Sequence, residues 1–183
     1  MNRELQWADI EAAYQHVATR AVETICHGQE LLPAALLIWL AETRPGAVER
    51  CEAFPPEITL WAFRSSAGKA RLGVLIRECL APAPAGETLP YVIVVVSEAW
   101  TVKSVPGETR PFAERPFAER PDRRDVLMVA VHTTLSTHMG ASPIETSADG
   151  ARHCTLQPLD SDARISGRLS MDPDGGPGRC KDH

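Results

Sequence analysis

The segment Tyr91-Val92-Ile93-Val94-Val95-Val96 decides the fold of this chain, because as a β-strand it would place apolar side chains on both of its faces. Successive side chains of a strand point to opposite faces of the sheet, so a strand without polar positions is buried on both faces. Its content of Val and Ile favours a strand over a helix. The sequence therefore predicts a central strand here, and we expect helices to cover it on one face.

Two segments show the pattern of helices. Residues 4–26 carry apolar side chains three and four residues apart, which places them on one stripe of an amphipathic helix, and Gly28 is a typical stop signal. The stripe consists of Trp7, Ile10, Tyr14, Val17, Ala21 and Ile25. A second helix is predicted to begin at a serine cap, Ser65 or Ser66, and to end near Leu80.

The remaining apolar segments are predicted to be strands. Residues 31–41 are apolar throughout, so the spacing of apolar residues does not distinguish a buried strand from a buried helix there. The turn Pro45-Gly46 and the segment 48–54 favour a strand with an antiparallel partner. The later strands are expected at 126–131, 139–144, 154–159 and 163–169, the first two forming a hairpin. The sequence thus predicts an α+β fold with an antiparallel or mixed sheet and two helices on one face.

Two segments are predicted to lie outside the core. Residues 101–125 contain Pro-Phe-Ala-Glu-Arg twice in succession, and such an insertion is tolerated in a surface loop but would shift the register of a strand. Residues 172–183 have little to bury, so a disordered tail is expected. We therefore expect one domain over residues 1–171.

Composition narrows the classes of function. The net charge is −5, and the first 60 residues hold nine acidic and four basic side chains, so direct binding of nucleic acid is not expected. A protein partner is expected instead, and the acidic charge permits one of basic character. No stretch is long and apolar enough for a membrane span, no signal-peptide pattern is present, and five scattered cysteines are typical of reduced thiols. We expect a cytoplasmic protein without a cofactor.

Three histidines form the best metal hypothesis. If residues 133–137 form the hairpin turn, His132 and His138 lie near each other across it, and His153 begins the next expected strand. Zinc needs three or four ligands of this kind that converge on one point. The spacing matches no compact zinc motif, and exposed histidines near turns are common, so the sequence favours the absence of a metal.

A second hypothesis concerns the end of the central strand. Glu98 and Trp100 follow the apolar run directly, and functional side chains gather at strand ends. Arg123 and Arg124 precede the next expected strand and are the predicted ion-pair partners of Glu98. A partly desolvated carboxylate suits acid–base chemistry, and a purely structural ion pair is the alternative interpretation.

The segments around this site resemble known small proteins. Val96-Ser97-Glu98-Ala99-Trp100, followed by Arg120-Pro121-Asp122-Arg123-Arg124-Asp125-Val126-Leu127-Met128-Val129, resembles small uncharacterised proteins encoded in bacterial genomes and phages. Some genes of this kind inhibit host defence systems by occluding a partner surface. The resemblance implies a biological context and no particular chemistry.

The sequence favours a non-enzymatic protein-binding module, because no common nucleophile, phosphate-loop or metalloprotease motif is present. The expected contact surface is the acidic side of the first helix, with Glu4, Asp9, Glu11 and Glu23. The alternative is a small hydrolase or metal-dependent enzyme built on Glu98 or on the histidines. An exposed strand edge beside residues 126–144 would also support a homodimer.

Overall fold

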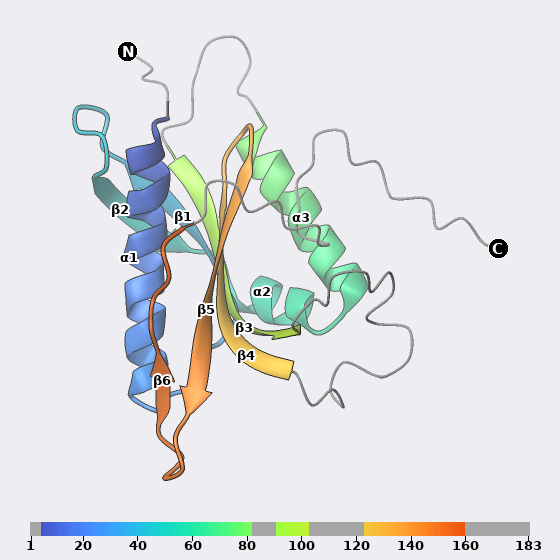
Figure 1. The fold of residues 1–183 in the computed structure, drawn as a ribbon. Helices are drawn as coiled ribbons and strands as arrows, with labels where there is room; N and C mark the ends of the chain where they lie inside the picture. Colours follow the sequence, from blue (N-terminus) through green and yellow to red (C-terminus); the bar gives the residue numbers. More distant parts are fainter. Residues whose placement is uncertain (1–4, 82–90, 103–122, 160–183) are drawn as a thin grey trace, which may run out of the picture.

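The computed structural model describes residues 5–81, 91–102 and 123–159. Within these ranges the chain forms three helices and a six-stranded antiparallel sheet with the order β2-β1-β3-β4-β5-β6 (Figure 1). The helices are α1 (Trp7–Cys26), α2 (Pro56–Phe63) and α3 (Ser66–Leu80). The strands are β1 (Ala34–Leu40), β2 (Val48–Ala53), β3 (Tyr91–Val102), β4 (Arg123–His132), β5 (Thr137–Thr146) and β6 (Arg152–Cys154). The predicted α+β class is confirmed.

The valine-rich segment lies in the middle of this sheet, as predicted. It forms the first half of β3, between β1 and β4. Val92, Val94 and Val96 pack in the same apolar cluster as α1, whereas Ile93 and Val95 pack in a second cluster with α3 and Ala62 of α2. This alternation places α1 on one face and the α2–α3 pair on the other, as Figure 1 also shows. The expectation of both helices on one face is therefore corrected.

Helix α1 is held at its start by a buried carboxylate. The backbone N–H of Gln6 donates to Oδ2 of Asp9 at 2.9 Å, and the N–H of Gly46 donates to Oδ1 at 2.8 Å. An acidic side chain in the first turn of a helix is stabilised by the helix dipole, and here it also ties the helix to the β1–β2 turn. Asp9 is completely buried, so its expected place on an exposed acidic surface is wrong.

The middle of α1 approaches the sheet closely at Tyr14. The Tyr14 side chain is buried, and its hydroxyl donates to the carbonyl oxygen of Gln157 at 2.7 Å. Its ring lies against Gly140 of β5, where an added Cβ would fall 2.5 Å from Cε2 of Tyr14. Glycine at position 140 is thus what lets the tyrosine ring fit between the helix and the sheet.

The opposite face is covered by two shorter helices. Pro56 occupies the first turn of α2, and Oγ of Ser65 accepts a hydrogen bond from the N–H of Gly68 at 3.0 Å, which confirms the predicted cap of α3. A Cβ at Gly68 would lie 2.6 Å from the carbonyl oxygen of Ala62, so α3 begins in close contact with the end of α2. Helix α2 has no counterpart in the sequence-based prediction.

The predicted strands are mostly confirmed, with different ends. Strands β1 and β2 match the predicted antiparallel pair, and β4 and β5 match the predicted hairpin. Strand β6 shares only Cys154 with the strand expected at 154–159, so that placement is wrong. The ends of the loop expected at 101–125 are wrong, because β3 continues to Val102 and β4 begins at Arg123. Residues 103–122, the strand expected at 163–169 and the tail at 172–183 lie outside the described residues. In the described ranges, no helix is long and apolar enough to cross a membrane.

Candidate functional site

Several exposed apolar side chains gather between α2 and α3. The two helices form the walls of a cavity of about 560 Å³. It is lined by Glu57, Ile58, Trp61, Ala62, Arg71, Leu72, Val74, Leu75 and Glu78. Pockets of about 300–1,000 Å³ are the usual size for a bound ligand. We refer to this cavity as the α2–α3 groove.

Three large apolar side chains of the groove face solvent. Trp61 is 50% exposed, Val74 is 41% exposed and Ile58 is 38% exposed. Contiguous exposed apolar surface of this kind marks interaction sites in soluble proteins, whereas single exposed apolar residues are normal. The other exposed large apolar residues, Trp7, Leu32, Trp100 and Leu135, belong to separate segments of the chain and do not line the groove.

The helices expose these residues because the opposite sides of both helices are buried. In α2, Thr59 and Ala62 are the buried positions, which leaves Ile58 and Trp61 on the outer side of the helix. In α3, Leu72, Ile76 and Leu80 pack toward the sheet at four-residue spacing. The neighbouring positions 71, 74, 75 and 78 therefore turn toward α2 and line the groove.

The charges along the groove are predominantly acidic. Glu57 and Glu78 form no ion pair with any residue that the structure describes. The guanidinium of Arg71 lies 5.8 Å from the ring centre of Trp61, at the distance of a cation–π contact. An apolar groove with two unpaired carboxylates suits a ligand that combines apolar and basic groups.

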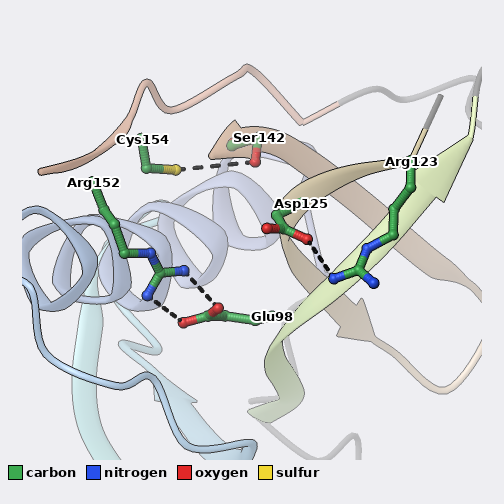
Figure 2. A network of polar contacts seen from close by, with 6 residues as sticks. All are labelled: Glu98, Arg123, Asp125, Ser142, Arg152 and Cys154. Atoms are coloured by element: carbon green, nitrogen blue, oxygen red, sulfur yellow. Dashed lines mark hydrogen bonds and ion pairs between the residues drawn. The ribbon is translucent and has the colours of Figure 1, made fainter. Parts of the chain in front are cut away.

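The predicted site at Glu98 has a different partner from the one expected (Figure 2). Arg152 of β6 binds the carboxylate of Glu98 with both terminal nitrogens, at 3.1 Å to Oε1 and 2.6 Å to Oε2. This contact raises the pKa of Arg152, chiefly through the hydrogen bonds to the carboxylate. Because both oxygens are engaged, the geometry is that of an ion pair linking β6 to β3.

The two arginines that were expected to pair with Glu98 lie elsewhere. The guanidinium of Arg123 lies 4.0 Å from the ring centre of Trp100. It also contacts Oδ1 of Asp125 at 3.4 Å (Figure 2). Arg124 pairs in register with Thr101, one position beyond Trp100, so its side chain leaves the opposite face of the sheet. The predicted pairing of Glu98 with Arg123 or Arg124 is therefore wrong.

The three histidines do not converge. In the β4–β5 hairpin His132 is paired with Thr137, and His138 is paired with Val131, so the two imidazoles point to opposite faces of the sheet. His153 lies on β6 opposite Glu145 and is exposed. Among the residues that the structure describes, no group of three His, Cys, Asp or Glu side chains could hold a metal ion. The metal hypothesis on His132, His138 and His153 is thus contradicted.

Each of the two hairpin histidines has a structural environment of its own. His132 is buried beside Thr137, whose Oγ1 lies 3.0 Å from Nδ1, and burial lowers the pKa of this histidine to about 4. His138 contacts the ring of Trp7 at 5.3 Å, and its Nε2 lies 2.7 Å from Oγ of Ser136. Burial also lowers the pKa of His138.

The acidic surface expected on α1 is smaller than the sequence indicated. Glu11 and Glu23 are exposed, Asp9 is buried, and Glu4 lies outside the described residues. Arg20 is exposed on the same helix, three residues before Glu23. The described part of α1 therefore presents a mixed surface.

Sequence reasoning did not find the α2–α3 groove. The segment Pro55-Pro56-Glu57-Ile58 could have indicated a helix here, because a proline is favoured in the first turn of a helix and an apolar stretch follows it. Comparison with protein-family models, with curated proteins and with solved structures found no match. The site is therefore interpreted from its own geometry.

Proposed function

We propose that this chain is a non-enzymatic protein-binding module and that the α2–α3 groove is its contact surface. The observation that carries the proposal is the gathering of Ile58, Trp61 and Val74, all exposed, along one cavity. Large aromatic side chains in such positions commonly contribute most of the binding energy of an interface. A groove between two helices suits an amphipathic helix of the partner, with its apolar face toward Trp61.

The charges define the partner further. Glu57 and Glu78 favour Lys or Arg beside the apolar anchors, and the net charge of −5 would steer a basic partner toward the chain. The proposal includes that the chain is encoded by a phage or mobile element and inhibits a bacterial defence protein by covering part of its surface. This part of the proposal is supported by the resemblance of residues 91–131 alone.

The first experiment compares two tryptophans of equal exposure. The probes are synthetic 18-residue amphipathic helices with Leu at i, i+3, i+4 and i+7, flanked either by Lys or by Glu, and binding is measured by calorimetry. Trp61→Ser should weaken the Lys-flanked peptide at least about tenfold, the effect expected of an interface anchor. Trp100→Ser is the matched control, because Trp100 is 51% exposed and lies outside the groove. Equal affinities in the two variants would contradict the proposal.

The second experiment tests the charges. Reversal of Glu57 and Glu78 to Lys should invert the preference between the Lys-flanked and Glu-flanked peptides, and the preference should shrink as salt is raised. Reversal of Glu11 and Glu23 on α1 is the matched control. If only the α1 reversal changes binding, the contact surface lies on α1 as the sequence suggested.

A further inference from the structure

A second cavity lies on the other face of the sheet, between α1 and the β1–β2 edge. It has a volume of about 150 Å³. Its walls are mostly aliphatic, formed by side chains such as Val17, Ala21, Leu36 and Val96. A cavity of this size holds a molecule of roughly six heavy atoms, since benzene fits a dry cavity of about 150 Å³. It is therefore a site for a small molecule.

One side of this cavity is polar and basic. Arg20 and His16 line it from successive turns of α1. The guanidinium of Arg20 makes no ion pair or hydrogen bond with any described residue, and Nε2 of His16 is buried without a hydrogen-bond partner in the same ranges. Buried polar atoms in proteins are nearly always hydrogen-bonded, so an unpaired nitrogen beside a cavity indicates a missing partner.

The electrostatics agree with an anionic ligand. Burial lowers the pKa of His16, and the neighbouring Arg20 lowers it further. Cys51, which also lines the cavity, has a pKa raised by burial, so this side chain is a neutral thiol at ordinary pH. The described lining thus contains a cation and no carboxylate.

We propose that this cavity binds an aliphatic monocarboxylate of about four to five carbons, with its carboxylate on Arg20 and its alkyl chain against the apolar wall. Arg binds carboxylates through two parallel N–H donors, which fixes their orientation. Phosphate could also bind Arg20, but its other oxygens would lose water against the aliphatic wall without gaining hydrogen bonds there, so the wall favours an anion with an alkyl chain. This site is independent of the α2–α3 groove.

The test measures binding of pentanoate by calorimetry and by the NMR spectrum of the full chain. Pentanoate should bind with a Kd on the order of 1 mM, as expected for a ligand of its size. From acetate to pentanoate, each added methylene should tighten binding about fourfold, which corresponds to about 0.8 kcal/mol per buried methylene. Phosphate, 1-pentanol and pentylamine should each bind at least about tenfold more weakly than pentanoate. Phosphate lacks the alkyl chain, and the other two compounds lack the carboxylate.

Variants locate the site and separate it from nonspecific uptake. Arg20→Gln should weaken pentanoate binding about tenfold and remove the preference over 1-pentanol, whereas Arg50→Gln, outside the cavity, should change neither. Pentanoate should also raise the pKa of His16 in an NMR titration, because a nearby negative charge favours the imidazolium. An unchanged affinity in Arg20→Gln, acetate binding as tightly as pentanoate, or no binding at about fifty times the expected Kd would each overturn the proposal.

Discussion

The two faces of the sheet are covered by helices of different construction. On one face α1, with 20 residues, buries a single stripe of side chains that includes Ile10, Tyr14, Val17 and Ile25. On the other face α2 and α3, with 8 and 15 residues, share the cover and leave Ile58, Trp61 and Val74 exposed where they meet. One long amphipathic helix hides most of its apolar stripe, here all but Trp7, which is 39% exposed, whereas two short helices at an angle expose the outer sides of their junction.

This difference separates residues that the fold needs from residues that are available for binding. The α1 face is fixed by specific contacts, namely Asp9 at the β1–β2 turn and the hydroxyl of Tyr14 on Gln157. Among the described residues, the exposed side chains Ile58, Trp61 and Val74 are not part of the apolar cluster that α2 and α3 form with the sheet. Apolar surface that the fold does not bury is the surface most available to a partner.

The largest expected effect tests the tight packing under α1. Gly140→Ala would place a Cβ 2.5 Å from the Tyr14 ring, so either the helix or the strand must move. Overpacking of this kind should lower the free energy of unfolding by about 3 kcal/mol, measured by urea denaturation. The matched substitution is Gly73→Ala in α3, where an added Cβ has no atom within 4 Å apart from the helix's own backbone.

Gly73→Ala should instead stabilise the chain by about 0.5–1 kcal/mol, because alanine favours a helix over glycine by this amount. Opposite signs at positions 140 and 73 would sharpen the contrast between the two faces. If both substitutions had similar small effects, the Tyr14 ring would not lie tightly against Gly140.

The next effect concerns the buried histidine on the α2–α3 face. The pKa of His132 is about 4 in the folded chain and about 6.5 when it is exposed, so folding favours the neutral imidazole. Because the folded pKa is lower, the stability contributed by neutral His132 is complete above about pH 6.5 and is lost as the pH falls toward 4. At pH 5 the loss should be roughly 2 kcal/mol.

The measurement is the free energy of unfolding of the wild type and of His132→Gln between pH 7.5 and pH 5. The wild type should lose stability more steeply in this window, and the difference should be largest at the acidic end. His16 and His138, whose pKa values are also lowered by burial, supply a smaller slope that both proteins share. Parallel curves would show that His132 is protonated in the folded chain without cost.

The sequence predicted the elements whose information is local. The apolar stripe of α1, the double-sided strand Tyr91–Val96 and the β4–β5 hairpin all follow from spacing within one segment. The structure confirms them, except that Trp7, the first residue of the predicted stripe, is 39% exposed. Helix α2 was missed because its eight residues are too few to show a helical period.

The candidate sites depended on register, which a single sequence does not reveal. A shift of one residue in the hairpin would have put His132 and His138 on the same face, and the observed register separates them. Glu98 likewise pairs with Arg152, which is 54 residues away in the chain and lies on a strand of three residues. The exposure of the groove depended in turn on the packing of α2 against α3, which no local pattern specifies.

The smallest expected effect concerns that ion pair, which joins β6 to the α1 face of the sheet. The side chains of Glu98 and Arg152 are 30% and 25% exposed, so water screens part of their attraction. In a double-mutant cycle with Glu98→Gln and Arg152→Met, we expect a coupling free energy of about 1 kcal/mol, at the upper end for surface pairs because the contact is bidentate. The same cycle on Arg50 and Glu52, whose side chains are both more than half exposed, should give a coupling near zero. A coupling free energy at Glu98 and Arg152 as small as in this control would mean that the ion pair does not stabilise the attachment of β6. Strand β6 would then be held by its backbone pairing with β5 and by the contacts of Cys154.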